Sequence, residues 1–234
     1  MKLKNTLLAA TLVAASLPAA ADLTNLNALT QDQFRKLSED LGAAFSYKGV
    51  TPATSLGPWG FDLGVELTTT DMRNSDIFRI AGSGSVDRLF VPKVHINKGL
   101  WTGSDIGGFY GGSSEIGGSL WGASLRQAFI EDTATSPAFA GRLSGTRTTD
   151  LGSLKVYSLA ADLMLSKRLA IVTPYVGAGI VRVESKATGF ETVTNNEGRY
   201  FGGVNVNLGI VNLAAEAERL GSNTSLSAKV GWRF

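Results

Sequence analysis

"SLSAKVGWRF" (residues 225–234) ends the chain and alternates strictly between polar and apolar side chains. Successive side chains of a β-strand point to opposite faces, so a period of two predicts a strand with one apolar face. That face carries Leu226, Ala228, Val230, Trp232 and Phe234. A strand of a soluble β-sandwich would alternate in the same way, so other parts of the chain are needed to identify the fold.

The stretch 1–21 indicates export. Lys2 and Lys4 precede an apolar run, Leu7 to Leu17, which is followed by small residues up to Ala21. This order is typical of a secretory signal peptide that is cleaved after Ala21. The run is about half the roughly 20 residues that a membrane-spanning helix requires.

Composition supports an exported β-protein. The 234 residues include 28 glycines, no cysteine and one histidine, with a net charge of +2. A fold without cysteine has no disulfides to stabilise it, and frequent glycine favours strands that bend. The near balance of charges argues against a nucleic-acid partner, which would require a basic stripe.

One amphipathic helix is predicted within 22–42. Thr30 and Gln33 resemble a capping box, and Gly42 stands where a helix would end. The apolar side chains of this helix are Leu29, Phe34, Leu37 and Leu41.

The remainder of the chain predicts strands separated by turn residues. The candidate strands are 43–50, 60–70, 88–98, 104–112, 117–129, 138–149, 154–166, 171–185, 199–209, 212–219 and 224–234. Most of them match the roughly 9 to 11 residues of a membrane-spanning strand better than the mode of about 5 to 6 in globular proteins. Bacterial barrels have even strand numbers, so we expect 10 or 12 strands. With both termini in the periplasm, the longest loops, 71–87 and 186–198, would face outward.

Strand length, small residues on the apolar faces and aromatics near strand ends favour a membrane barrel over a sandwich. We predict an all-β fold: an antiparallel transmembrane β-barrel (43–234) of about 10–12 strands, preceded by a signal peptide (1–21) and a helical segment (22–42). In such a barrel the polar face lines the lumen. The predicted lumen-facing residues are Asp62, Glu66, Lys93, His95, Asp105, Arg126, Arg142, Asp162, Arg182, Glu184, Glu216, Glu218, Lys229 and Arg233.

The final "KVGWRF" resembles the C-terminal signature of Gram-negative outer-membrane proteins. The resemblance implies an outer-membrane location, recognition by the barrel assembly machinery, and contact with outer-membrane lipid and lipopolysaccharide. "DLGAAFSY", "GFDLGVEL", "TPYVGAG" and "NVNLG" are similar to a family of proteobacterial outer-membrane barrels that has no established activity. Leu226, Ala228, Val230, Trp232 and Phe234 would then form the assembly signal.

Catalytic motifs are sparse. The sequence has no P-loop, dinucleotide fingerprint or G-x-S-x-G elbow, and no ligand-spaced cluster for a metal, so neither a cofactor nor a metal is expected. The single histidine, His95, lies on the polar face. A lipid-modifying hydrolase at the barrel rim would need a serine within hydrogen-bond reach of it, so an ion-paired luminal histidine is the preferred interpretation.

The nearly balanced luminal charges suggest ion pairs across a narrow interior. We expect Glu216 and Glu218 to lie opposite Lys229 and Arg233 on the neighbouring strand. The predicted function is a narrow channel or a transporter of a small or apolar solute, whose identity the sequence does not specify. The alternatives are a structural or interaction barrel without a conducting pore, and a lipid-modifying enzyme.

Overall fold

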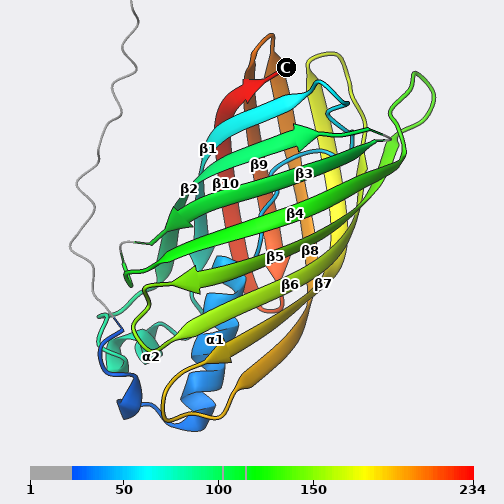
Figure 1. Ribbon diagram of the computed structural model, residues 1–234. Helices are drawn as coiled ribbons and strands as arrows, with labels where there is room; N and C mark the ends of the chain where they lie inside the picture. The colour runs from blue at the N-terminus through cyan, green and yellow to red at the C-terminus, as the bar shows by residue number, and fades with distance from the viewer. Residues whose placement is uncertain (1–22, 102, 114) are drawn as a thin grey trace, which may run out of the picture.

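The computed structural model describes residues 23–234 except 102 and 114, and its strands form one closed antiparallel barrel (Figure 1). The predicted signal peptide lies outside the described residues. The strands are β1 (Phe61–Asp71), β2 (Arg88–Gly99), β3 (Ser104–Gly112), β4 (Ser119–Ile130), β5 (Ala138–Thr149), β6 (Lys155–Ser166), β7 (Val172–Lys186), β8 (Val193–Leu208), β9 (Val211–Leu220) and β10 (Asn223–Arg233).

The strand count and the fold class are confirmed, because ten strands close the barrel in the described residues. Ten of the predicted strands correspond to observed ones. The eleventh, 43–50, is wrong, and the predicted loop 186–198 is shorter, because β8 already begins at Val193. The stretch 71–87 contains a short helix, α2 (Ser75–Ile80).

The barrel is closed by pairing of the first and last strands. Leu63 lies opposite Trp232 and Val65 opposite Val230. Phe61 N–H donates to the Phe234 carbonyl at 2.7 Å, and Phe234 N–H donates back at 3.1 Å. Their rings stack with centroids 5.7 Å apart. Every strand therefore has two neighbours, which removes the open edge that would otherwise leave backbone groups unpaired in lipid.

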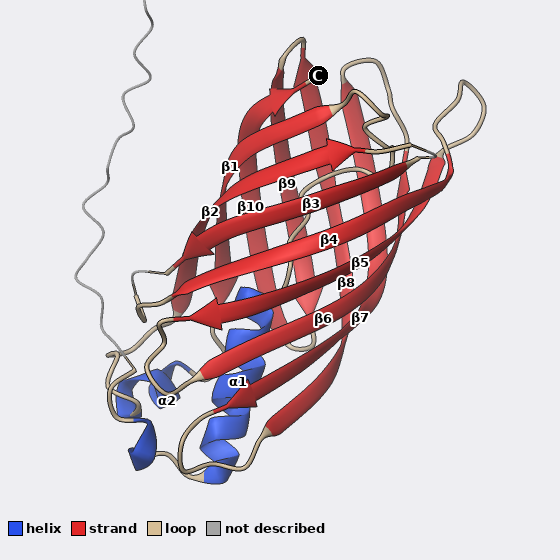
Figure 2. Cartoon of the chain, in the orientation of Figure 1, coloured by secondary structure: helices blue, strands red, loops and turns tan. Residues whose placement is uncertain are grey.

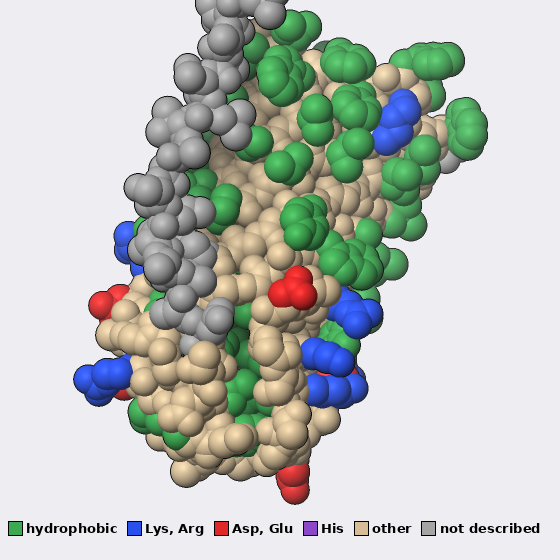
Figure 3. Space-filling view, turned by 60° about the vertical axis from the view of Figure 1, so that its left-hand side comes forward, with side chains coloured by type: hydrophobic (Ala, Val, Ile, Leu, Met, Phe, Trp, Pro, Cys, Tyr) green, Lys and Arg blue, Asp and Glu red, His purple; other side chains and the backbone are tan. Residues whose placement is uncertain are grey.

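The outer surface of the barrel is apolar. Leu159 is 64% exposed and Ile180 is 69% exposed, and similar side chains project from every strand. Figure 3 shows these hydrophobic side chains over the upper wall, with charged side chains gathered around the lower end. Strand lengths run from 9 residues in β3 to 16 in β8, which is sufficient to cross a bilayer. An apolar exterior on spanning strands is the architecture of a transmembrane barrel.

A helix, α1 (Gln31–Phe45), lies at the lower end of the barrel (Figure 2). The predicted capping box is confirmed: Gln33 N–H donates to Thr30 Oγ1 at 3.2 Å, and Thr30 N–H donates to Gln33 Oε1 at 2.9 Å. Neither this helix nor any other described helix is both long and apolar enough to span a bilayer.

The predicted helix end at Gly42 is wrong, because α1 continues to Phe45 inside the barrel. Gly42 serves close packing instead. A Cβ atom at this position would lie 2.8 Å from both Cγ atoms of Val183 on β7. Only glycine allows the helix to approach the strand this closely.

After α1 the chain continues through the lumen as an extended segment, residues 46–53, which we call the luminal segment. All of its residues are buried. Alternation in 43–50 predicted a strand of the wall, but an extended chain inside the wall alternates equally. What differs is the hydrogen bonding, because the luminal segment has no strand ladder partner and bonds to side chains instead.

The two ends of the described chain lie at opposite ends of the barrel (Figure 1). Leu23 and a 3-10 turn, η1 (Leu26–Ala28), lie with α1 and α2 at what we call the helical end. Phe234 lies at the other end, here the C-terminal end. The barrel itself begins at Phe61 and ends at Arg233 on the same side, as expected for an even strand number, and the luminal segment connects this side to the helical end.

Asp40 of α1 ties the helical end together. Its carboxylate accepts hydrogen bonds from Asn223 Nδ2 of β10 at 2.7 Å and from the Asn74 backbone N–H at 2.8 Å. The backbone N–H of Asn25 donates to the Ala81 carbonyl at 2.9 Å. These contacts fasten α1 and η1 to the loop between β1 and β2.

The close approach of Gly42 to Val183 generates a stability prediction. Gly42→Val should lower the free energy of unfolding by about 1–3 kcal/mol, because the added methyl groups overlap the Val183 side chain. The measurement is urea unfolding in lipid vesicles, followed by tryptophan fluorescence. Gly42→Val/Val183→Ala should recover part of the loss, and a double variant no more stable than Gly42→Val would contradict this packing.

Candidate functional site: the filled lumen

Most of the predicted lumen-facing residues point into the barrel. Arg233 lies at the C-terminal mouth with its side chain 15% exposed. The fully inward and buried members are Asp62, Glu66, Lys93, His95, Asp105, Arg126, Arg142, Asp162, Glu216, Glu218 and Lys229. Polar alternation thus located the charged lining of this barrel.

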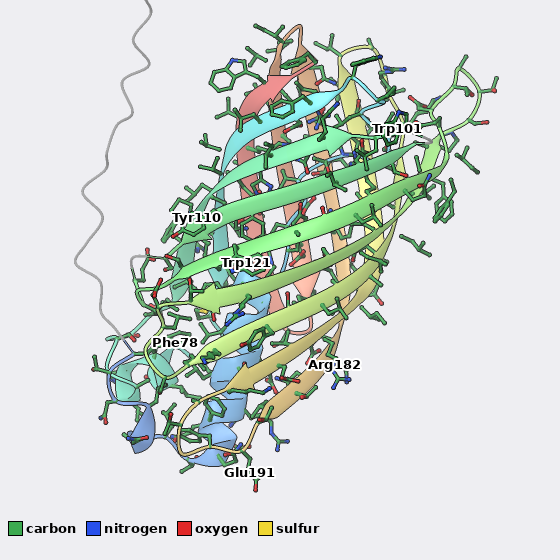
Figure 4. The ribbon with its side chains drawn as sticks, viewed as in Figure 1. Phe78, Trp101, Tyr110, Trp121, Arg182 and Glu191 are labelled. Carbon is green, nitrogen blue, oxygen red and sulfur yellow. The ribbon has the colours of Figure 1, made fainter. Side chains whose placement is uncertain are left out.

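Arg182 and Glu184 are exceptions, because the predicted faces of β7 are reversed: Tyr175, Val181 and Val183 point inward, and Val176 and Ile180 point outward. Arg182 is exposed and points away from the barrel (Figure 4), and Glu184 pairs outside with Lys186 at 2.7 Å. Val181 and Val183 are buried in the apolar cluster around α1. The inward face is apolar here because it packs on a helix, and the outward face is polar because this part of the strand extends past the apolar band.

The last hairpin also differs from the prediction. Its turn is tight, so Glu216 lies opposite Ser227 and Glu218 opposite Ser225. Lys229 lies opposite Ala214, and its ammonium is 3.1 Å from Asp62 across the closing seam. Arg233 also pairs with Asp62. The expected pairing of Glu216 and Glu218 with Lys229 and Arg233 is therefore wrong.

Glu66 forms the centre of a second cluster. Lys93 Nζ is 2.9 Å from one carboxylate oxygen, and His95 Nε2 is 2.7 Å from the other. Thr68 Oγ1 also hydrogen-bonds to Glu66. The His95 ring stacks on Phe109 with centroids 5.3 Å apart. All of these side chains are buried, so His95 is a luminal residue that lies against the Glu66 carboxylate.

The luminal segment is held by charged side chains of the wall. Lys48 Nζ is 2.7 Å from Glu218 and donates to the Ala43 carbonyl at 2.6 Å. Arg199 Nη1 donates to the Tyr47 carbonyl at 2.8 Å, and Arg126 Nη1 donates to Thr51 Oγ1 at 3.0 Å. The wall therefore binds both the backbone and the side chains of the segment.

Arg142 and Arg199 share Asp162, with Arg142 Nη2 at 3.0 Å. The Arg142 guanidinium lies over the ring of Tyr47, 5.7 Å from its centroid. Gly49 is required beside it, because a Cβ atom there would lie 1.8 Å from Arg142 Nη1. Arg142 of the wall thus packs closely against Tyr47 and Gly49 of the luminal segment.

Two cavities lie beside the luminal segment. A polar cavity of about 10 Å³ lies between Tyr47, Thr51, Asn97, Ser124 and Arg126. That volume corresponds to about one water molecule. A larger hollow of about 150 Å³ lies at the C-terminal mouth, between Pro52, Ser55, Arg168 and Arg233.

Three luminal residues were missed by the sequence reasoning. Tyr47 and Lys48 were assigned to a strand of the wall. Arg199 is completely buried. It lies an even number of residues from Asn205 and Asn207 on the same strand, so strand alternation could have placed it on the same polar face. No group of three or more acidic or histidine side chains that could hold a metal ion occurs in the described residues.

Two carboxyl groups outside the strands have shifted pKa values. Burial raises the pKa of Glu39 on α1, and the nearby Glu197 and Asp40 add to the effect. Burial also acts to raise the pKa of Asp132, but hydrogen bonds from Lys167 and from the Arg168 N–H outweigh it and hold the pKa below its usual range. Asp132 thereby links two neighbouring turns at the C-terminal end.

No protein-family model matches the chain, and no curated protein sequence matches it. Solved structures of outer-membrane barrels do. Neisserial surface protein A is 15% identical with a TM-score of 0.34, covering 75% of this chain and 96% of that one. Omp33 of Acinetobacter baumannii is 7% identical with a TM-score of 0.36, covering 75% and 98%.

The translocator domain of the autotransporter NalP from Neisseria meningitidis is 14% identical with a TM-score of 0.37, covering 89% of this chain and 97% of that domain. All three TM-scores lie below 0.5. The fold assignment therefore rests on the closed strand order and the apolar outer surface of this chain.

The pairing of Lys229 with Asp62 generates a second prediction. Lys229→Met should lower the free energy of unfolding by about 3–5 kcal/mol, because it leaves a buried carboxylate without one of its cations. Urea unfolding of Lys229→Met, Asp62→Asn and the double variant should show strong non-additivity. Lys229→Met combined with Glu216→Gln should be additive, and stronger coupling to Glu216 than to Asp62 would contradict the observed register.

Proposed function

We propose that this protein is an outer-membrane β-barrel closed by its own N-terminal segment, and that it acts as a structural or interaction barrel without a conducting pore in this state. The observation that carries the proposal is the burial of residues 46–53 along the lumen. The polar cavity beside Tyr47 and Thr51 has room for only about one water, which supports a lumen without a continuous aqueous path. A barrel of this strand number is narrow enough for such filling.

The lengths of the connections between strands support an outward-facing helical end. Outer-membrane barrels have short periplasmic turns and longer extracellular loops. The longest connection, 72–87, contains α2 and lies at the helical end, whereas the longest connection at the opposite end is 131–137. Together with the predicted cleaved signal peptide, this supports a C-terminal end in the periplasm. The helical end, with α1 and η1, then lies at the cell surface.

The C-terminal strand supports assembly by the outer-membrane barrel assembly machinery. Leu226, Ala228, Val230, Trp232 and Phe234 all project outward, and Phe234 is 71% exposed. An outward row of apolar side chains on the closing strand is accessible to a partner before the barrel seals. The same row faces lipid afterwards.

A gated conduit is the second candidate function. The specific observation is that charged side chains hold the luminal segment, notably Glu218, Arg199 and Arg126. A lumen stripped of the segment would be polar and could pass a small solute. Selectivity would then depend on Asp62, Glu66 and the cations beside them.

We expect no lipid-hydrolase activity. A rim enzyme needs its base at the surface where lipid arrives, within reach of a nucleophile. His95 is instead completely buried and paired with Glu66. This arrangement supports a structural role for the histidine.

Conductance distinguishes the closed barrel from an open channel. In planar bilayers the full chain should show no stable current steps, whereas a variant lacking residues 30–53 should conduct, because the charged lumen is then open. Different gel migration of unboiled and boiled samples identifies the preparations that are folded. Regular current steps from the intact, folded chain would contradict the closed barrel.

Surface labelling tests the orientation. Because the chain has no cysteine of its own, only the introduced cysteine can react. In intact cells, Asn27→Cys at the helical end should react with a membrane-impermeant maleimide. Ala134→Cys in a turn at the C-terminal end should react only after the outer membrane is permeabilised. The reverse pattern would show that the helical end faces the periplasm.

Deleting Phe234 should reduce the amount of folded protein in the outer membrane several-fold, because the deletion removes the backbone pairing with Phe61 and the last outward aromatic. Quantitative blotting of unboiled membrane fractions gives the folded amount. Tyr200→Ala removes an equally exposed aromatic from β8 and should leave assembly unchanged. Equal losses in both variants would contradict a specific role for the terminal residue.

A further inference from the structure

We propose that the outer face of β5–β8 holds a lipopolysaccharide molecule, with an acyl chain in an apolar groove and the phosphates on a basic rim. The proposal rests on the outer-membrane location and the outward-facing helical end proposed above. The groove and the rim adjoin each other on the same strands. Together they match a lipid that combines acyl chains with a phosphorylated headgroup.

The groove consists of two hollows that share Leu143, Ala161 and Ile180. One has a volume of about 430 Å³ and extends past Phe129 towards the C-terminal end. The other has a volume of about 530 Å³ and extends to Arg182. Both lie on the outside of the barrel wall, where their larger side chains are exposed.

The shape of the groove follows from the order of small and large side chains. Ala161 on β6 lies opposite Leu143 on β5 and Ile180 on β7, and Ile180 lies opposite Gly198 on β8. The small residues form the floor and the large ones form the sides. A flexible apolar chain in this groove contacts the protein on several sides, which gains more dispersion energy than a flat surface offers.

The basic rim consists of Arg147, Lys155, Arg182 and Lys186, all exposed. Lys155 lies opposite Lys186, and Arg182 lies opposite Leu159 at the end of the groove. Glu184 is the acidic side chain among them, and it pairs with Lys186 at 2.7 Å. The Arg147 guanidinium lies over the Tyr157 ring, 5.5 Å from its centroid. The rim therefore keeps a clear excess of positive charge.

The level of the rim matches a lipid headgroup. Along β7 the outward side chains change from apolar to charged between Ile180 and Arg182. Along β6 the same change occurs between Leu159 and Lys155, with Tyr157 between them. Aromatics and basic residues are typical of the membrane interface. One guanidinium group can donate two parallel hydrogen bonds to the oxygens of one phosphate. Cations spread over three strands can therefore bind a headgroup that carries two phosphates.

Binding of bis-phosphorylated lipid A to the full, folded chain in detergent tests the proposal, with native mass spectrometry as the readout. Arg147→Gln/Arg182→Gln should weaken binding about tenfold or more, because each cation near an anionic headgroup contributes substantially. Ala161→Phe, which fills the groove without changing charge, should weaken it too. Arg88→Gln, an exposed arginine on the opposite side of the barrel, is the matched control and should bind normally.

Only preparations whose unboiled and boiled forms migrate differently are titrated, so failure to form a barrel counts against the proposed function and not against this site. Equal binding by the double arginine variant and the intact chain would overturn the site. Equal binding of lipid A and its dephosphorylated form would also overturn it, because the rim would then play no part. Weakening by Arg88→Gln of the same size would show a general charge effect and likewise refute the site.

Discussion

Charged side chains inside a sealed barrel have no bulk water to solvate them, and this constraint organises the structure. An isolated buried charge is costly unless an opposite charge and hydrogen bonds compensate it. Asp62 obtains its cations across the closing seam, and Glu66 obtains Lys93 from β2. Glu218 differs, because its nearest cation is Lys48 of the luminal segment. Arg199 of β8 also lies 3.7 Å from Glu218, so the luminal segment adds the closer of two cations to a buried carboxylate of the wall.

The helix α1, which precedes the luminal segment, explains why the barrel has two zones. Through most of the barrel the inward face is polar and the outward face apolar, as lipid outside and charges inside require. Near the helical end α1 supplies an apolar partner, so the inward positions of β7 carry Val181 and Val183, and the outward position between them carries Arg182. The resulting basic rim lies directly beyond the apolar groove of β5–β8. On β7, apolar packing on the helix inside and charge at the membrane interface outside thus occur at the same level of the strand.

Strand alternation predicted most of this fold. The ten strands, the capping box at Thr30 and the buried set from Asp62 to Lys229 all follow from local patterns. Three features depend on tertiary contacts and could not be read locally. Residues 43–50 alternate like a wall strand, but they lie in the lumen. The ion partner of Lys229 lies across the seam, and the tight turn before β10 shifts the expected register. The inward face of β7 is apolar near the helical end because α1, which is distant in sequence, packs against it.

The most direct test of the filled lumen is a cross-link between the N-terminal helix and the wall in the native membrane. Ser38 Oγ of α1 lies 2.6 Å from Ser185 Oγ of β7, and the chain has no cysteine of its own. Ser38→Cys/Ser185→Cys should form a disulfide in nearly all of the folded protein, whereas Ser38→Cys/Ser136→Cys, which joins opposite ends of the barrel, should form none. Absence of the Ser38–Ser185 disulfide in folded, membrane-embedded protein would show that the helix does not enter the barrel and would contradict the account.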